Sequence, residues 1–295
     1  MRIGILAAAN SWYLRDLVRA AADRHDVFPL SFNQIHAGLF DERPFVLRHG
    51  DEPVQMDALL VRSMPPGSLE QVVFRMDLLH RVEAAGTRVL NPPRSLESAI
   101  DKFLTTAKIQ AAGIPTPPTV ACQTAEIAMS AFLELGEDVV IKPLFGGEGR
   151  GLTRVSDPEL ALRAFKLLEQ LGSVIYLQSF VHHQGWDIRI LLVGSRVFAM
   201  RRRNDTDWRT NVRRGARGEL VEPTDEWIQL ARQAAKAVGT PLAGVDILVD
   251  QDDRPFVLEV NAVPGWRALA KTINIDIAHQ VLCFLEECQD SHPIR

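Results

Sequence analysis

The alternation of short apolar runs with amphipathic segments over the first ninety residues is the feature that most restricts the fold. Runs of strand length and β-branched character occur at 3–8, 27–32, 58–62 and 88–90. Helical periodicity separates them at 12–24 and 69–85. Strands that alternate with helices in this way form a parallel sheet covered by helices. We therefore predict a Rossmann-like α/β domain over residues 1–94, ending at the proline-rich sequence Asn91-Pro92-Pro93.

The rest of the chain predicts two α+β lobes, over 95–183 and 184–295. The first begins with a helix that has Ser95 as its N-cap and ends at Ala112, before Gly113. From 119 to 180 the order is strand, helix, strand, loop, strand, helix, strand. The second lobe has a hairpin over 187–202, and then the following elements: a helix at 224–238, strands at 244–250 and 255–261, and terminal helices.

Composition excludes several classes of protein. The chain has 295 residues with a formal charge of −4, which argues against a general nucleic-acid or anionic-membrane binder. No apolar stretch approaches the roughly 20 residues of a membrane span, and the apolar N-terminal run is too short for a signal peptide. The three cysteines, Cys122, Cys283 and Cys288, lack metal-ligand spacing. We expect a cytoplasmic protein with reduced thiols.

One motif points to phosphate binding. The β-branched run Val139-Val140-Ile141 delivers Lys142, and four glycines follow within six positions: Gly146, Gly147, Gly149 and Gly151. Glycines let backbone N–H groups approach an anion closely, and a nearby lysine adds a point charge. The order differs from a Walker A loop, because Lys142 precedes the glycines. The alternative is a mobile hairpin tip with a solvated lysine.

A second motif points to a cation. Asp246 lies on one apolar strand, and Glu259 and Asn261 lie two residues apart on the next, so the latter two project from one face. Asp246 could meet them across the strand pair. Buried carboxylates among valines and leucines require a counter-charge, and oxygen ligands suit Mg²⁺. The alternative is that these are structural acids paired with arginines.

Together the motifs form the two halves of a nucleoside triphosphate site, and here the chain resembles the ATP-grasp superfamily, more closely the RimK-like glutamate ligases. The resemblance extends over nearly the whole length. It rests on nine sequence stretches in order: Asp101-Lys102-Phe103, Gly113-Ile114-Pro115-Thr116-Pro117, Ile141-Lys142-Pro143-Leu144, Tyr176-Leu177-Gln178-Ser179-Phe180-Val181, Gly185-Trp186-Asp187-Ile188-Arg189, Trp208-Arg209-Thr210-Asn211, Arg213-Arg214-Gly215, Gly244-Val245-Asp246 and Glu259-Val260-Asn261-Ala262-Val263-Pro264-Gly265.

The resemblance implies a role for each matching residue. Lys102 and Lys142 would reach the nucleotide phosphates, under the glycine loop 146–151. The backbone of Gln178, Ser179, Phe180 and Val181 would read the adenine edge, with Asp187 near the ribose. Asp246, Glu259 and Asn261 would hold the metal ions. Arg209, Asn211 and Arg214 would face the γ-phosphate and the carboxylate substrate.

Seven arginines between 201 and 217 allow other interpretations. Few stacking aromatics alternate with them, which disfavours nucleic-acid binding. Surface salt bridges are the alternative for Arg202, Arg203 and Arg217. A guanidinium binds carboxylate or phosphate through two parallel hydrogen bonds, which favours a substrate role for Arg209 and Arg214.

The resemblance implies an ATP-dependent carboxylate–amine ligase that forms an amide through an acyl phosphate. The amine would be that of L-glutamate, and the acceptor carboxylate would belong to a peptide C-terminus or to a small coenzyme or metabolite. The expected cofactors are ATP and Mg²⁺ or Mn²⁺, with two ions, and a homo-oligomer is expected. The alternatives are a ligase for another amine and a non-catalytic ATP-binding regulator. All of these require the glycine loop and the acidic strands to meet across one cleft.

Overall fold

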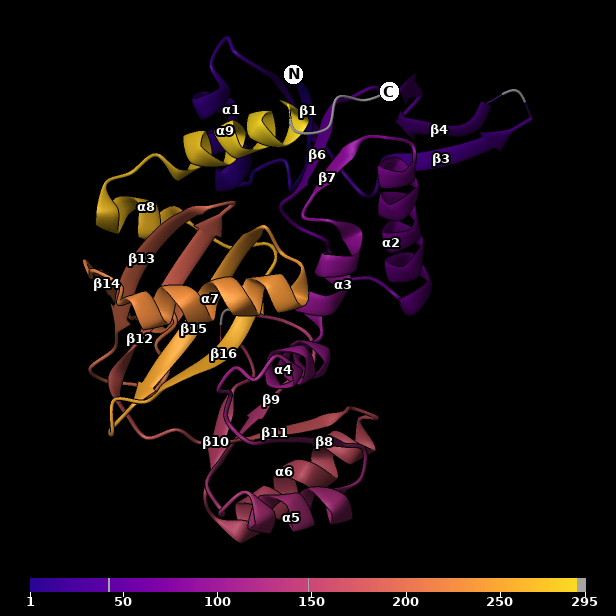
Figure 1. The fold of residues 1–295 in the computed structure, drawn as a ribbon. Coiled ribbons are helices and arrows are strands. Elements are labelled where there is room, and N and C mark those ends of the chain that lie inside the picture. Colours follow the sequence, from indigo (N-terminus) through magenta and orange to yellow (C-terminus); the bar gives the residue numbers. More distant parts are fainter. Residues whose placement is uncertain (42, 148, 291–295) are drawn as a thin grey trace.

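The computed structural model describes residues 1–41, 43–147 and 149–290, so Glu148 of the glycine loop lies outside the described residues. Three parts follow one another along the molecule: an N-terminal domain, a large lobe built on the widest sheet, and a small lobe at the far end (Figure 1). The predicted combination of a Rossmann-like sheet with two α+β lobes is confirmed.

The N-terminal domain is built on a parallel sheet of order β2-β1-β6-β7. Its strands are β1 (Arg2–Leu6), β2 (Asp26–Leu30), β6 (Ala58–Val61) and β7 (Arg88–Leu90). Helix α1 (Trp12–Ala21) begins at its N-cap Ser11, and helix α2 (Leu69–Ala84) begins with a capping box between Ser68 and Gln71. The buried apolar strands and capped amphipathic helices explain why the alternation in the sequence predicted this sheet.

A small antiparallel sheet, which was not predicted from the sequence, lies between β2 and β6 in the chain. It comprises β3 (Ile35–Phe40), β4 (Arg43–His49) and β5 (Glu52–Pro53), and it projects from the domain (Figure 1). Leu39 and Phe40 are adjacent and both exposed, so the apolar residues of this hairpin do not follow the two-residue alternation that identifies a half-buried strand.

The predicted single helix from Ser95 to Ala112 is wrong, because two helices cover this range. Helix α3 (Pro93–Ile100) begins after Pro92, and helix α4 (Lys102–Ala111) has its own N-cap, Asp101, whose carboxylate accepts a hydrogen bond from the Leu104 N–H at 3.0 Å. Asp101 is extended (φ −91°, ψ 108°), so the chain turns there. The break places Lys102 in the first turn of α4.

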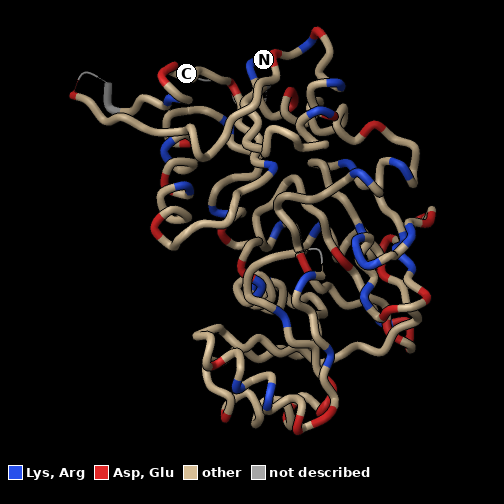
Figure 2. The backbone as a smooth tube through the Cα atoms, turned by 180° about the vertical axis from the view of Figure 1, so that it is seen from behind, with Lys and Arg blue, Asp and Glu red and all other residues tan. Residues whose placement is uncertain are grey.

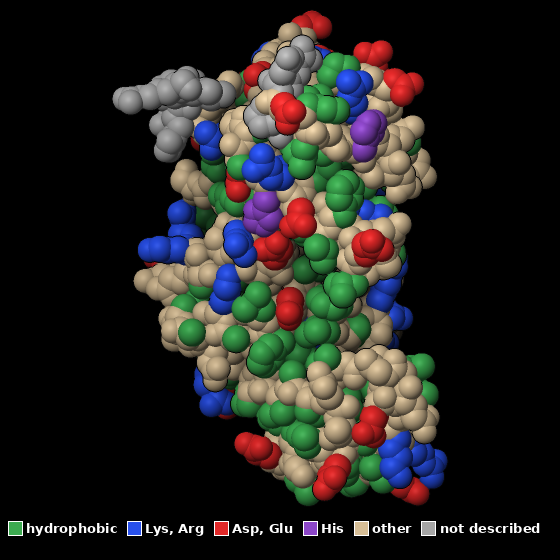
Figure 3. Space-filling view, turned by 90° about the vertical axis from the view of Figure 1, so that its right-hand side faces the viewer, with side chains coloured by type: hydrophobic (Ala, Val, Ile, Leu, Met, Phe, Trp, Pro, Cys, Tyr) green, Lys and Arg blue, Asp and Glu red, His purple; other side chains and the backbone are tan. Residues whose placement is uncertain are grey.

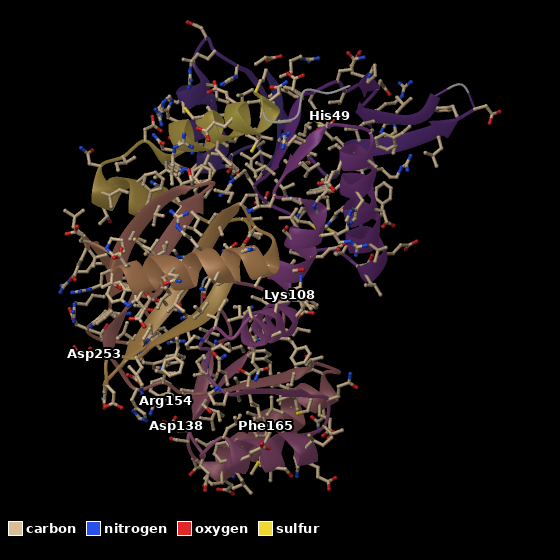
Figure 4. All side chains as sticks on the ribbon, in the orientation of Figure 1. His49, Lys108, Asp138, Arg154, Phe165 and Asp253 are labelled. Carbon is tan, nitrogen blue, oxygen red and sulfur yellow. The ribbon has the colours of Figure 1, made fainter. Side chains whose placement is uncertain are left out.

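The small lobe has an antiparallel sheet of order β10-β9-β11-β8, covered by two helices. Its elements are β8 (Thr119–Cys122), α5 (Ala125–Glu134), β9 (Val139–Lys142), β10 (Thr153–Val155), α6 (Pro158–Gln170) and β11 (Ile175–Ser179). The order of elements predicted for 119–180 is confirmed. Phe132 of α5 and Phe165 of α6 meet edge to face with ring centroids 6.4 Å apart, in the core between helices and sheet (Figure 4).

The large lobe is an antiparallel sheet of order β14-β13-β12-β15-β16, and one of its faces is covered by helix α7 (Asp225–Val238) (Figure 1). The strands are β12 (His183–Val193), β13 (Arg196–Arg203), β14 (Arg217–Glu219), β15 (Leu242–Asp250) and β16 (Pro255–Asn261). A short 3-10 helix, η1 (Val212–Arg214), lies in the Arg-rich loop. Acidic and basic segments lie close together over this lobe (Figure 2).

The C-terminal helices bring the chain back to the N-terminal domain. Helix α8 (Arg267–Ile273) leads to α9 (Ile277–Asp290), which packs on α1 (Figure 1). Residues of β1, α1, α9 and the large-lobe sheet share one apolar core. Figure 3 shows apolar side chains mixed with charged ones on an outer face, and no helix among the described residues is long and apolar enough to cross a membrane.

Asn91 joins the N-terminal domain to the large lobe. Its side chain is fully buried, and its amide nitrogen donates to the carbonyls of Leu242 and Ala262, both at 2.6 Å. Its amide oxygen accepts from the Leu242 N–H at 3.0 Å. One side chain therefore satisfies three peptide groups of β15 and of the turn after β16.

We expect Asn91→Ala to lower the free energy of unfolding by about 2–3 kcal/mol, because each buried peptide group left unpaired costs roughly 1–3 kcal/mol. The measurement is the thermal midpoint, which should fall by several degrees. Asn33→Ala changes an exposed asparagine of the same domain and should leave the midpoint in place. Equal midpoints for both variants would contradict the bridging role.

Candidate active site

The glycine loop and the acidic strands meet across one cavity, as the sequence analysis required. The cavity lies between the two lobes, and residues of both lobes line it. Most of the predicted site residues line it: Lys102, Lys142, Gly146, Gly147, Gly149, Gln178, Ser179, Phe180, Val181, Asp187, Arg209, Asn211, Asp246 and Glu259. Asn261 lines two adjoining cavities, which it shares with Glu259.

The register of the large sheet creates a row of charged side chains. Asp246 on β15 lies opposite Glu259 on β16 and opposite Arg189 on β12. Asp187, two residues before Arg189 on β12, lies opposite Arg202 on β13. Because residues two apart share a face, acids and arginines alternate on one surface of the sheet. The predicted meeting of Asp246 with Glu259 is confirmed.

Arginines neutralise part of this row. Asp246 forms ion pairs with Arg189 Nε at 2.6 Å and with Arg202 Nη2 at 2.9 Å. Asp187 accepts a hydrogen bond from Arg202 Nε at 2.7 Å and another from the Thr210 hydroxyl at 2.6 Å. Asp246 is therefore paired with arginines in this structure, as the alternative interpretation of the acidic strands expected, and Asp187 is paired with an arginine in the same way.

The alternative of a surface salt bridge, which the sequence allowed for Arg202, Arg203 and Arg217, is wrong for Arg202. Its side chain is only 5% exposed and lies between Asp187 and Asp246. Although burial lowers its pKa, these two carboxylates raise it above the ordinary value. Arg203 and Arg217 do form surface ion pairs, with Glu219 at 3.5 Å and 3.1 Å.

Glu259 differs from the other acids. Among the described residues it forms no hydrogen bond or ion pair, and the buried Oδ1 of Asp246 accepts no well-aligned hydrogen bond. Asn261 Oδ1 accepts from the Val263 N–H at 2.8 Å and keeps a second lone pair. The described chain has no group of three His, Cys, Asp or Glu that could hold a metal. Two acids and one amide, all oxygen donors, fit Mg²⁺.

The two predicted phosphate lysines line the same cavity as this row, Lys142 from the small lobe and Lys102 from α4. Lys142, at the end of β9, donates to Gln178 Oε1, and Lys102 donates to the Gly146 carbonyl. Burial lowers the pKa of Lys142 to about 8, against the opposing charge of Glu259. Burial also lowers the pKa of Lys102. Neither ammonium forms an ion pair within the described residues, so the charge of both is available to an anion.

The glycine loop is attached to the large lobe. Gly146, Gly149 and Gly151 have φ of +109°, +71° and +71°, a region that favours glycine. At Gly149 a Cβ would also lie 2.3 Å from Asn211 Oδ1. The Gly149 carbonyl accepts from Arg214 Nη2 at 3.3 Å. The loop therefore needs glycine there for both conformation and close approach.

The predicted substrate arginines contact protein groups. Arg209 forms an ion pair with Asp207 at 2.6 Å and donates to the Leu152 carbonyl at 3.3 Å. Arg214 lies outside the lining of the main cavity, as does Gly151. With Asn211, the two arginines connect the glycine loop to the large lobe.

The segment predicted to read adenine closes the other end of the cavity. Phe180 has Arg154 stacked over its ring at 3.6 Å, and Arg154 donates to both carboxylate oxygens of Asp138 at 2.8 and 2.6 Å. Figure 4 shows Arg154 and Asp138 side by side at the edge of the small lobe. Trp208 meets Phe180 edge to face at 5.7 Å. These contacts fix the Phe180 ring beside the cavity.

Comparison with known proteins agrees with this geometry. A model of the RimK-like ATP-grasp domain matches residues 99–285. A tetrahydromethanopterin:alpha-L-glutamate ligase of Methanosarcina acetivorans is 31% identical over 97% of this chain and 98% of its own length. A probable alpha-L-glutamate ligase of Picosynechococcus is 28% identical over 97% and 96%.

A solved structure shares the fold. The ATP-grasp ligase PsnB, complexed with a minimal precursor, Mg and ADP, has a TM-score of 0.76 at 22% identity, with 97% of this chain and 96% of that chain covered. The family model covers most of the chain, and the relatives match almost from end to end. The chain therefore belongs to the RimK-like ATP-grasp family of ligases.

Proposed function

We propose that this ATP-dependent ligase joins the α-amino group of L-glutamate to an acceptor carboxylate at the end of a peptide or of a small coenzyme or metabolite. The observation that carries the proposal is the pair of unpaired lysines, Lys102 and Lys142, facing the unpaired Glu259 across one cavity. A triphosphate with a divalent cation matches both sides of that cavity. The names of the relatives support glutamate as the amine.

The chain's own residues account for the first step as charge neutralisation and positioning, which dominate phosphoryl transfer. Lys142 and Lys102 balance the charge of the phosphates. Asp246, Glu259 and Asn261 would hold Mg²⁺, or Mn²⁺, which supplies Lewis-acid stabilisation when bound. The acceptor carboxylate attacks the γ-phosphorus, and ADP leaves. We propose that two ions take part.

The second step uses no protein nucleophile. The amine attacks the carbonyl of the acyl phosphate, and inorganic phosphate leaves with the bonding electrons. The glycine loop, held by Arg214 and Asn211, would keep water from the acyl phosphate. We further propose that the protein acts as a cytoplasmic homo-oligomer.

The direct test is to incubate the enzyme with cell extract, ATP, Mg²⁺ and isotope-labelled L-glutamate, and to search by mass spectrometry for new products heavier by one labelled residue. A parallel panel of amino acids in an ADP-release assay tests the choice of amine. ATP binding without ADP release for any amine would favour the non-catalytic regulator instead.

We expect Glu259→Gln to reduce Mg²⁺-dependent ADP release at least 100-fold, because the amide removes a charged metal ligand while keeping the shape of the side chain. Its thermal midpoint should match that of the wild type. Glu169→Gln, at an exposed position on α6, is the control and should keep full activity. If the activity of Glu259→Gln stayed within threefold of the wild type, Glu259 would not be a metal ligand.

We expect kcat/KM for ATP to depend on pH through the charge of Lys142. Its ammonium is charged below its pKa of about 8 and neutral above it, so kcat/KM for ATP should fall about tenfold per pH unit above pH 8. Lys142→Arg, whose guanidinium stays charged, should lose this decline. Lys142→Met should reduce kcat/KM for ATP about 10- to 100-fold at pH 7, if a hydrogen bond to a charged group contributes roughly 1.5–3 kcal/mol. Parallel pH profiles for wild type and Lys142→Arg would contradict the assignment.

A further inference from the structure

A second cavity, of about 730 Å³, also reaches Glu259 and Asn261. It lies between the large-lobe sheet, α1 and α8, and we call it the basic cavity. Six of its lining residues are cationic: Arg62, Arg189, Arg202, Arg213, Arg267 and Lys271. Glu259 is the one acid among the described lining residues. The charge of this cavity therefore favours an anionic ligand.

Arg62 is the most unusual of these residues. It follows β6 directly, at the carboxyl end of the parallel sheet, where open α/β sheets bind ligands. The residue is only 6% exposed, and its guanidinium packs against the rings of Tyr13 and Trp266, at 4.7 and 4.2 Å from their centroids. Nη2 donates to the Pro264 carbonyl at 2.8 Å.

The remaining donors of Arg62 have no partner. Both Nε and Nη1 are buried without a hydrogen bond, and no carboxylate pairs with the guanidinium among the described residues. Burial lowers its pKa to about 10, so it is still charged at neutral pH. A buried, unpaired charge is costly unless a ligand pairs with it. The protein keeps this guanidinium in place with two aromatic rings instead of an acid.

Arg189 presents a second unpartnered donor in the same cavity. Its Nε and Nη2 face Asp246, whereas its buried Nη1 has no hydrogen-bond partner. The neighbouring strand leaves space for it at Gly244, where a Cβ would lie 2.4 Å from Nη1. The basic cavity is thus lined by two arginines that each have a buried donor without a partner, Arg62 from the N-terminal domain and Arg189 from the large lobe.

A third cavity also reaches Glu259 and Asn261, but its chemistry is different. Its walls between α2, α3 and Phe145 are largely apolar, with Met64, Met76 and Leu96 among them, and its charged residues are the acids Glu97, Asp101 and Glu259. This lining suits an apolar, weakly charged body and disfavours an amino acid with two carboxylates. The two substrates can therefore reach Glu259 and Asn261 through two different cavities.

We propose that the basic cavity is the binding site of the amino-acid substrate, and that Arg62 pairs with one of the two carboxylates of L-glutamate. This rests on the proposed function. Bound there, the amino group would lie toward Glu259 and Asn261, where the acyl phosphate forms. Arg62 is thus a specificity residue supplied by the N-terminal domain, which neither its position in the sequence nor the family motifs indicated.

The test measures binding of L-glutamate to the whole protein by isothermal titration calorimetry in the presence of Mg²⁺ and a non-hydrolysable ATP analogue. We expect Arg62→Met to raise the Kd of L-glutamate at least tenfold while the Kd of the nucleotide stays within twofold. Selectivity for L-glutamate over L-glutamine should fall in the same variant, because glutamine lacks the second carboxylate.

Arg75→Met is the matched control. Arg75 is also 6% exposed, donates to a backbone carbonyl (Pro65, 2.6 Å) and lies over an aromatic ring (Phe32, 5.7 Å), but it does not line the basic cavity. It should leave the Kd of L-glutamate unchanged. The double variant Arg267→Gln/Lys271→Gln replaces two exposed cations of the cavity and leaves the core unchanged. It should weaken the binding of L-glutamate severalfold, and it provides the test if Arg62→Met does not fold.

Unchanged L-glutamate binding in Arg62→Met, or in the double variant if Arg62→Met does not fold, would overturn the assignment. So would equal weakening by Arg75→Met, which would indicate a general effect of removing a buried arginine. If the wild type binds the nucleotide analogue but no L-glutamate, the choice of amine itself is wrong, and the proposed function fails separately from the role of Arg62.

Discussion

The ion pairs of Arg202 with Asp187 and Asp246 are the interaction on which the site depends. They are buried, so each charge would be unstable alone, and the antiparallel register of β12, β13 and β15 fixes their positions. Arg202 and Arg189 together neutralise these two acids, which leaves Glu259 as the acid of this row without an ion-pair partner among the described residues. The free negative charge is thereby confined to the side of the sheet that faces Lys102 and Lys142.

The two lysines also keep their charge available for a ligand, because neutral groups hold them in place. Gln178 and the Gly146 carbonyl orient the two ammonium groups without cancelling their charge. Had carboxylates taken these places, a phosphate would have to displace them. The large lobe supplies the free acid Glu259, the small lobe supplies the free cation Lys142, and α4 supplies Lys102. A triphosphate with a divalent cation would therefore stabilise the closed arrangement of the lobes.

Many of the strands and several of the site residues could be predicted from the sequence, because they depend on local sequence patterns. Strands such as 139–142 and 255–261 are β-branched runs with clear limits, and the period of two put Glu259 and Asn261 on one face. The break at Asp101 was missed because an aspartate inside a helical pattern does not distinguish a surface position from a new N-cap. A surface position remained an alternative for Arg202, because its burial depends on a strand register that a single sequence does not show.

Arg62 shows the limit of sequence-based prediction most clearly, since it belongs to none of the motifs that indicated the site. Its partners, Tyr13 and Trp266, are 49 and 204 residues away, and they meet because α9 returns the C-terminal segment to α1. The packing of α9 on α1 thus contributes to the site as well as to stability, because Trp266 contacts Tyr13 and Asp16 of α1. A wall of the basic cavity would be lost without the N-terminal domain, so the catalytic lobes need this domain to complete the amino-acid side of the site.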